Sequence, residues 1–545
     1  DAMDRLIQTI RADGATETNV YDELGRLIVK TDATNRSVTM EYDDLGRLTT
    51  VEDPLNHRWT MAYDEANHRI QLTDPLNRST KWTFDALGRE LTHQLPLGQI
   101  QSQSYNAVGN QITHRDFNGQ RHSMQYDVLN RLIRAEYQDG RVITRDYLAN
   151  GLPERVVAPE GTWQYDYDLV DRLQRITTPI GALTYDYDAN GNRTLIDALH
   201  HGERYEQSFE FDAINRLIRM TDQRQGISEF DYNEVNDITR VTAPNGIQTR
   251  YNYDQKHNIT QVLQQNSAGD LLTQFDYALD AQGRRETIAQ TFGGGLTGDL
   301  TPWNLRTRVT DNSYDQAARL VAENIADSLL GANDNSYSYD TVNNMIESQV
   351  QGVTTAYRYD DNDRLLQKGG QRFQYDSVGN LIQESLDGAI TSYSYNSQQQ
   401  LVSVLNGQGQ TQMSYDPNGL LFAQMGPVAA NDYLWDSNRQ YAQIISEGQG
   451  SALSRIYSHA PGLIIEDAVN DIFYNHQDAK GSTSLVSNAT GILNAHVYSA
   501  YGDLIDSAAV NESQYLYGGE YFNKANNAYN LRKRWYRPEL GRFTQ

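Results

Sequence analysis

Aromatic positions recur along this chain at an almost constant spacing. In the N-terminal part, an aromatic residue followed by Asp, Asn or Leu stands at every twenty-first position, at Tyr21, Tyr42, Tyr63, Phe84, Tyr105, Tyr126 and Tyr147. The spacing continues less strictly to Tyr277, jumps to Tyr314, and resumes from Tyr339 to Tyr415. A fixed period of this length indicates that one supersecondary unit is stacked on copies of itself.

The pattern within one period predicts two antiparallel strands joined by tight turns. In residues 42–63, Asp43 can cap a type I turn with its side chain, and Gly46 can take the positive φ that a G1-bulge hairpin needs. Residues 48–51 and 58–63 have the composition of strands, and the Asp-Pro-Leu-Asn sequence of residues 53–56 separates them as a second turn.

Strand periodicity extends along most of the chain. Pairs of aromatic residues flank a single residue at several places, as in Tyr165-Asp166-Tyr167, which puts both rings on one face of a strand. About forty strands at a spacing of about 4.8 Å form a strip about 190 Å long, and accumulated strand twist prevents such a strip from staying flat. We therefore predict an all-β fold in which a strip of β-hairpins spirals and encloses space rather than filling it.

The composition suits half-exposed sheet faces better than a large aliphatic core, because the chain has 36 Tyr and only 38% hydrophobic residues. The net charge of −25 and the isoelectric point near 4.8 argue against nucleic acid or an anionic membrane surface as a partner. No cysteine is present, which excludes disulfides and thiolate metal sites. We predict no nucleic-acid partner, no membrane insertion by this chain, no cofactor and no metal site.

Two irregular regions interrupt the period. An insertion at about residues 288–312 contains three consecutive glycines, and we expect it to be a surface loop that leaves the strip; a plug or a partner contact is the alternative. After about residue 430 the period is lost, and the segment from Tyr515 onward is basic where the rest is acidic. We therefore divide the chain into a repeat strip, residues 1–430, and a closing region, residues 431–545.

The repeats resemble the YD repeats of Rhs proteins, Tc-toxin C components and teneurins, as Tyr42-Asp43-Asp44-Leu45-Gly46-Arg47-Leu48 illustrates. The tail, Leu531-Arg532-Lys533-Arg534-Trp535-Tyr536-Arg537-Pro538-Glu539-Leu540-Gly541-Arg542-Phe543, resembles the start of the Rhs-associated core signature. His476, Asp478 and Gly481 match a hairpin that leads into that core in the family. Together these matches cover nearly the whole chain.

The resemblance implies a fold and a function. The strip would be a hollow, cocoon-like shell that encloses the protein's own C-terminal toxin, and the protein would be exported from a bacterium by a secretion apparatus, such as type VI, or by a Tc-type partner protein. It also implies that the toxin is released by aspartyl-type autoproteolysis at the core. The family's catalytic aspartate pair follows the Gly-Arg-Phe motif and is expected beyond Gln545, so we expect this fragment alone to be inactive and the core to be truncated.

Arg534 is the one site residue that the resemblance carries over to this chain. It matches the arginine before the aromatic pair of the signature, whose role in the family is to support the cleavage site. A guanidinium could hold a carboxylate or polarise the scissile carbonyl. The alternative is an ion pair on a sheet face, with Glu539 or a neighbour.

Other interpretations remain beside the shell. A carbohydrate-binding surface repeat is the main alternative function, because stacked aromatic rings with Asp and Asn also suit sugars; it would leave the rings exposed on a filled rod. His476 and Asp478 are close enough in sequence for a metal, but no third ligand can be named. The turn aspartates are explained by turn chemistry without calcium.

Two further expectations concern charge and targeting. The arginines that recur at one repeat position, Arg26, Arg47, Arg89 and Arg131, are predicted to pair with turn aspartates across repeats. No signal peptide or transmembrane segment is evident. Because residue 1 is Asp rather than Met, we expect an excised fragment.

Overall fold

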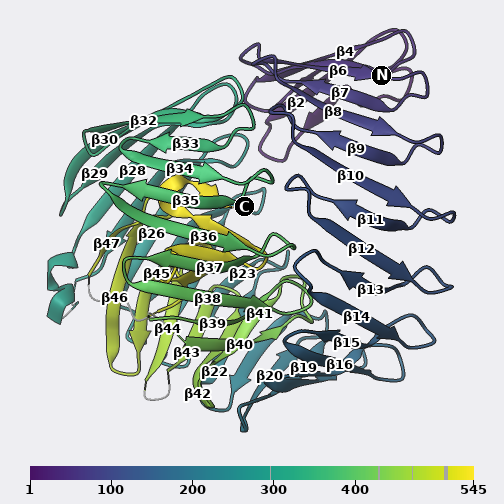
Figure 1. Cartoon of the computed structure of the whole chain (residues 1–545). Helices are drawn as coiled ribbons and strands as arrows, with labels where there is room; N and C mark the ends of the chain where they lie inside the picture. Colours follow the sequence, from purple (N-terminus) through teal and green to yellow (C-terminus); the bar gives the residue numbers. More distant parts are fainter. Residues whose placement is uncertain (295, 297, 428–429, 469–470, 509–512, 545) are drawn as a thin grey trace.

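The computed structural model describes residues 1–294, 296, 298–427, 430–468, 471–508 and 513–544. Within them, β1 (Gln8–Ile10) to β47 (Leu504–Ser507) form one antiparallel sheet of 47 strands in which each strand pairs with the next along the chain. A second sheet has four strands, β48 to β51, and the described helical segments are short 3-10 turns. The predicted all-β strip is confirmed (Figure 1).

The repeat has the predicted turn between β4 (Ser37–Tyr42) and β5 (Leu48–Glu52). The amide of Asp43 donates to the carbonyl of Arg47 at 3.0 Å, and the amide of Gly46 donates to the carbonyl of Asp43 at 2.9 Å. Gly46 has φ +80°, and the register shifts by a bulge just before Tyr42. This is a type I turn followed by a G1 bulge. It recurs with Gly, Asn or Asp at most of the left-handed positions, and with His257, Ala318 or Gln399 at others.

One arginine in each turn fixes its own repeat and the next. The carboxylate of Asp43 accepts hydrogen bonds from the amide of Arg47 at 2.9 Å and from its Nε at 2.7 Å. Arg47 Nη1 then donates to the carbonyl of Asp64 in the following repeat at 3.0 Å, and its guanidinium carbon lies 4.9 Å from the ring centroid of Tyr63. We name this arrangement the arginine clasp.

The clasp recurs at Arg26, Arg89, Arg131, Arg172, Arg216 and Arg319. The prediction for these arginines is therefore corrected in one respect. The ion pair is made with the aspartate of the arginine's own turn, because four residues of turn bring the two side chains together. The cross-repeat partners are a carbonyl and a tyrosine ring instead.

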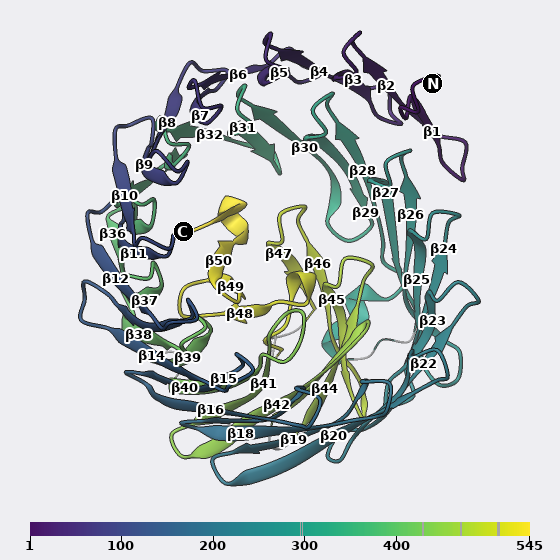
Figure 2. The ribbon, with the colours of Figure 1, turned by 90° about the vertical axis from the view of Figure 1, so that its right-hand side faces the viewer.

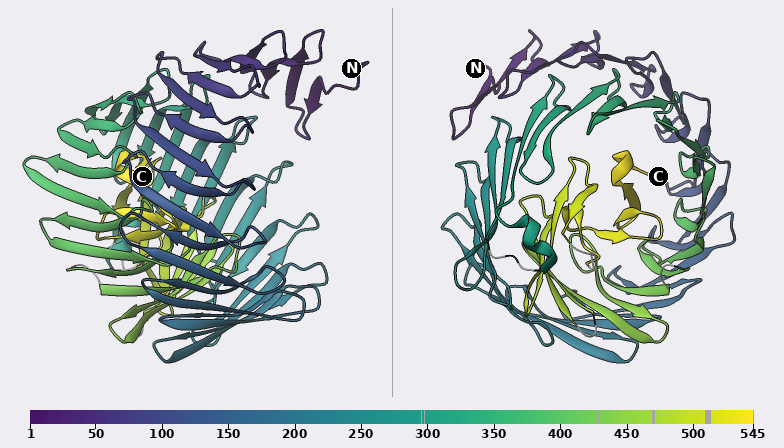
Figure 3. Two further views of the ribbon diagram at one scale, coloured as in Figure 1. Left: turned by 45° about the vertical axis from the view of Figure 1, so that its right-hand side comes forward. Right: turned by 90° about the vertical axis from the view of Figure 1, so that its left-hand side faces the viewer.

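The strip coils on itself, as Figures 2 and 3 show. Contacts between successive turns of the coil join residues at a decreasing sequence separation: Arg78 with Asp363 (285 residues), Tyr185 with Asp436 (251), Ala479 with Tyr277 (202) and Tyr339 with Tyr501 (162). The second turn is thus shorter than the first, and the strip forms an inward spiral that is not closed. The N-terminus lies on its outer turn, and the C-terminal strands lie inside the ring.

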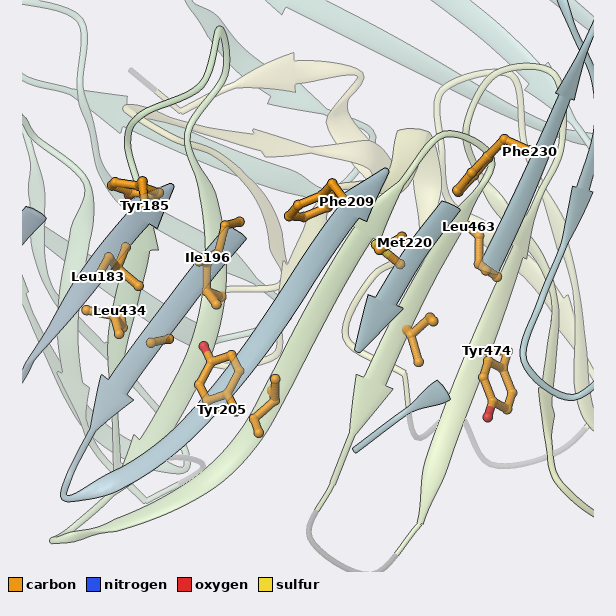
Figure 4. Packing of buried hydrophobic residues seen from close by; sticks show 14 of the residues in the cluster. Leu183, Tyr185, Ile196, Tyr205, Phe209, Met220, Phe230, Leu434, Leu463 and Tyr474 are labelled. Carbon is orange, nitrogen blue, oxygen red and sulfur yellow. The ribbon is translucent and has the colours of Figure 1, made fainter. Parts of the chain in front are cut away.

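The main hydrophobic core lies where the two turns of the spiral overlap. Side chains of β14 (Val142–Tyr147) to β26 (Leu271–Leu279) face those of β40 (Ala430–Asp436) to β44 (Ile472–Gln477). Figure 4 shows Leu183, Tyr205 and Met220 of the outer layer with Leu434 and Leu463 of the inner layer. Residues 1–134, all of them described, contain no buried hydrophobic side chain. Coiling therefore creates most of the apolar burial that stabilises this fold.

The insertion differs from the expected surface loop. The strands β27 (Arg285–Phe292) and β28 (Thr307–Tyr314) continue the sheet, so the irregular segment is confined to residues 293–306 and includes η1 (Gly298–Trp303). The rings of Trp303 and Phe292 meet edge to face, with their centroids 4.9 Å apart. Trp303 also packs in one cluster with Leu485 and Val497 of the inner layer. The insertion points into the spiral because its apolar side chains require burial.

Arg306 joins the insertion to both layers. Its guanidinium, almost fully buried, pairs with Asp327 through Nε at 3.1 Å and Nη2 at 2.7 Å, and with Asp506 of β47 through Nη1 at 2.8 Å. It also lies 4.2 Å from the Trp303 ring centroid. Burial alone would raise the pKa of Asp327, but the hydrogen bonds from Arg306 and two backbone amides lower it to about 2.

We predict that Arg306→Ala destabilises the fold by about 3–5 kcal/mol, because it removes the buried cation between Asp327 and Asp506 and leaves Asp327 with Arg308 alone. Equilibrium denaturation in urea measures the loss. Arg155→Ala is the control, because its pair with Asp146 is half exposed and is expected to contribute less than about 1 kcal/mol. Equal losses for the two variants would show that Arg306 does not hold the layers together.

Candidate functional site: the C-terminal segment inside the spiral

The segment that resembles the Rhs-associated core lies inside the ring (Figure 2). Its sheet consists of β48 (Tyr521–Asn523), β49 (Ala528–Leu531), β50 (Arg534–Arg537) and β51 (Arg542–Phe543). The 3-10 turns η2 (Tyr517–Gly519) and η3 (Pro538–Leu540) flank it. We call residues 513–544 the inner segment.

Hydrogen bonds fix the end of the inner segment to the inner turn of the spiral. The carbonyl of Thr544 accepts from the amide of Leu381 at 3.0 Å, and the amide of Thr544 donates to the carbonyl of Trp535 at 2.9 Å. Trp535 is buried, and its Nε1 donates to the hydroxyl of Tyr415 at 3.2 Å. Because Thr544 is itself buried, the polypeptide reaches its last described residue within the spiral.

Arg537 is the buried charge of the inner segment. Its Nη1 donates to Glu384 at 2.8 Å and to the hydroxyl of Tyr393 at 3.1 Å, and the same guanidinium pairs with Glu539. Burial alone would lower the pKa of Arg537, but Tyr393 and the two carboxylates raise it above its ordinary value. Arg537 was not among the predicted site residues, although it stands in the same motif as Arg534.

Arg534 has different surroundings. It is exposed on β50, and its guanidinium carbon lies 3.8 Å from the ring centroid of Phe543. Glu539, the ion-pair partner considered for Arg534, is engaged by Arg537. The Arg534 guanidinium therefore stacks on a ring close to the end of the described chain and presents its N–H groups to solvent.

His476 and Asp478 act separately in this structure. His476 Nε2 lies 2.8 Å from the hydroxyl of Ser487 on the neighbouring strand. Asp478 caps its own turn by accepting from the amides of Lys480 at 2.8 Å and Ser482 at 2.9 Å. The hydrogen bonds that His476 and Asp478 make within the hairpin give each residue a structural role.

Another carboxylate ties the inner segment to the sheet. Glu466, on β43 (Leu463–Asp467), accepts from the amide of Gln514 at 3.2 Å and from Asn475 Nδ2 at 2.6 Å. Arg455 Nη1 donates to it at 3.1 Å. Glu466 was not predicted from the sequence, because no motif marks it and its partners lie on other strands and in the inner segment.

Polar space remains between the inner segment and the wall. One cavity of about 700 Å³ is lined by Arg285, Lys480 and His496 among others, and a second of about 800 Å³ by Lys368 and Asp503. Both are bordered by polar as well as aromatic groups. The interior of the spiral is thus only partly filled by this chain.

The inner layer contains buried histidines. Burial lowers the pKa of His459, on β42 (Ala452–Ala460), and of His476 to about 3, and that of His496, on β46 (Gly491–Tyr498), to about 4. Each is neutral in the folded protein, whereas an unfolded histidine is protonated below a pH of about 6.5. Between these values the unfolded chain binds more protons, so stability falls as the pH falls.

We predict that the protein loses stability progressively from about pH 6.5 downward, with His476 alone contributing roughly 2–3 kcal/mol by about pH 4.5. Thermal unfolding at a series of pH values measures this. His476→Gln should flatten the profile, and replacement of the exposed His257 by Gln should leave it unchanged. A profile that is flat in the wild type would refute the assignment.

The comparisons with known proteins agree with this geometry. The sequence profile of the teneurin YD-shell family matches residues 2–171, 180–268 and 299–545. Among solved structures, the crystal structure of TcdB2-TccC3-TEV is similar over 98% of this chain and 33% of its own, with a TM-score of 0.73 and 14% sequence identity.

Two related structures give the same result. The Photorhabdus luminescens Tc holotoxin pore covers 98% of this chain and 32% of its own, with a TM-score of 0.64 and 15% identity. The crystal structure of TcdB2-TccC3 is similar over 98% of this chain and 33% of its own, with a TM-score of 0.65 and 15% sequence identity. This chain thus spans about a third of the length of these structures. No curated protein matches it, and no helix in the described residues is long and apolar enough to cross a membrane.

Proposed function

Because the chain belongs to the teneurin YD-shell family, we propose that it is the shell of an exported bacterial toxin of the Rhs or Tc type, which encloses a toxin that follows it in the polypeptide. The observation that carries this proposal is the position of Thr544, buried and hydrogen-bonded within the spiral. A segment that continues from this point begins inside the shell. The partly filled, polar interior supports the same function.

The surroundings of the repeat tyrosines favour a shell over a carbohydrate-binding surface. The hydroxyl of Tyr42 donates to the carbonyl of Leu27 at 2.8 Å, and that of Tyr63 donates to the carbonyl of Leu48 at 2.7 Å. Arginine guanidinium groups lie over both rings. These rings serve the contact between repeats, and the strip is coiled rather than a filled rod.

The N-terminal strands support a role for a partner protein. Residues 1–134 contain no buried hydrophobic side chain, and their contacts with the inner turn, such as Arg78 with Asp363 and Asn118 with Asp376, are polar. The similar structures contain TcdB2 together with TccC3. We propose that a partner of the Tc type, or a component of a secretion apparatus, completes the shell there and mediates delivery.

Release of the toxin is proposed to occur by autoproteolysis at the core that continues past Gln545. Arg534 would support that site, because its guanidinium is held over Phe543 yet keeps N–H groups free to hold a carboxylate or polarise a carbonyl. The aspartates that would activate water are expected in the continuing chain. The residues present here supply the scaffold and Arg534.

We predict that a protease recognition sequence placed directly after Gln545 is protected. It should be cut at least about tenfold more slowly than the same sequence placed before Asp1, because the protease must wait for the shell to open. Cleavage rates followed by gel electrophoresis give the comparison. Equal rates at the two ends would contradict enclosure.

In the full-length protein, we predict that Arg534→Ala slows self-cleavage about 100-fold, the usual effect of removing one group that stabilises developing charge. The rate of appearance of the released fragment is the measurement. Arg534→Lys should restore part of the rate, because it restores the charge, and Arg372→Ala, at an exposed position of β34 (Gln371–Tyr375), is the control. Wild-type cleavage by Arg534→Ala would remove this residue from the site.

A further inference from the structure

Two histidines and one aspartate converge where the outer and inner turns of the spiral meet. His200 ends β19 (Arg193–His200), His201 follows in the turn, and Asp432 lies on β40. His200 Nε2 lies 2.8 Å from Asp432 Oδ1, and His201 Nε2 lies 2.9 Å from Asp432 Oδ2. One ligand atom from each of the three residues lies within 4.8 Å of the others. The sequence gives no sign of this group, because His201 and Asp432 are 231 residues apart.

The local structure aims both imidazoles at the carboxylate. The two rings are stacked with their centroids 4.5 Å apart. His201 has φ +50°, a left-handed conformation that costs free energy for a residue with a side chain. A glycine, Gly448, faces the group: a Cβ atom there would collide with His201 Nε2 and Asp432 Oδ1. The space at the three polar atoms is therefore kept clear.

We propose that His200, His201 and Asp432 bind a divalent transition-metal ion, with zinc as the best match. Imidazole nitrogens with one carboxylate oxygen are ligands that zinc prefers, and three protein ligands leave one position for water. In a tetrahedral site with bonds of about 2.0–2.2 Å, the ligand atoms stand roughly 3.4 Å apart. The observed separations of His200 and His201 Nε2 from the carboxylate would widen by roughly half an ångström as the ion enters.

Ser446 supports this assignment as a positioning residue. His200 Nδ1 lies 2.7 Å from the hydroxyl of Ser446 on β41 (Gln443–Gln449). When Nδ1 of the neutral imidazole donates to Ser446, Nε2 carries the lone pair that binds a metal. A hydrogen bond to the other ring nitrogen is the usual support of a metal-bound histidine.

A cavity adjoins His201. His201 lines a space of about 280 Å³ together with Glu203, Arg224 and Asp467, so an ion and its water can reach the group from this side. The His201 and Asp432 side chains are partly exposed, whereas His200 is fully buried. The ion would fasten the inner turn of the spiral to the outer turn, and its binding free energy would add to the stability of the overlap.

The test is metal binding by the whole chain after removal of metal with a chelator. Zinc is titrated in competition with a chromophoric chelator, and Co²⁺ is used as a spectroscopic probe. We expect one equivalent to bind, the visible absorption of tetrahedral Co²⁺ to appear, and zinc to raise the unfolding temperature. His201→Gln and Asp432→Asn should each abolish these effects.

Two further variants separate the site from the fold. Ser446→Ala should weaken zinc binding about 10- to 100-fold, as expected for the support of a ligand. Replacement of His257, which contacts Asp237 in an exposed turn, by Gln should leave binding unchanged. Far-UV circular dichroism shows whether each variant folds. Absence of binding by the wild type, or binding retained by a folded His201→Gln, would overturn the proposal.

Discussion

The arginine clasp is the interaction on which this architecture depends. A single guanidinium satisfies the aspartate of its own turn, a carbonyl of the next repeat and the face of the next tyrosine ring. At a protein surface, each of these contacts alone contributes little to the free energy of folding. Together they set the position of each repeat relative to the next, and the bulge beside each repeat tyrosine adds strand twist. Each repeat is thus rotated and shifted by a similar amount and in the same direction relative to the one before it. Repetition of this step along the strip produces a coil.

Coiling of the strip buries hydrophobic side chains, which a single layer of strands leaves exposed. The outer turn has no buried hydrophobic residue before Ala135, and its core lies where β14 to β26 face β40 to β44. Buried charges with several partners then fix the inner parts: Arg306 holds β47, and Glu466 and Arg537 hold the inner segment to the inner turn. The inner segment is therefore fixed inside the spiral, which is the geometric basis of the proposed enclosure.

The structural features that depend on contacts within one repeat, or between adjacent repeats, could be predicted from the sequence. The spacing of aromatic residues, the Asp-x-x-Gly turns and the two strands per repeat are local properties, and the structure confirms them. The insertion around Trp303 was misplaced, because whether an apolar loop packs inward or outward depends on the curvature of the strip. The partners of Arg537 and the proximity of His200 to Asp432 could not be predicted from the sequence, because they also depend on the curvature of the strip. Which residues meet across the overlap depends on the radius of the spiral, and that radius sums small offsets over more than 200 residues.

Small-angle X-ray scattering on the 545-residue chain tests the central claim, a spiral strip that encloses space. A filled globular protein of this length has a radius of gyration of about 24 Å. The account predicts a clearly larger value, with a pair-distance distribution skewed toward long distances and a bounded maximum dimension. A symmetric distribution with a radius of gyration near about 24 Å, or the extended tail of a rod, would contradict it.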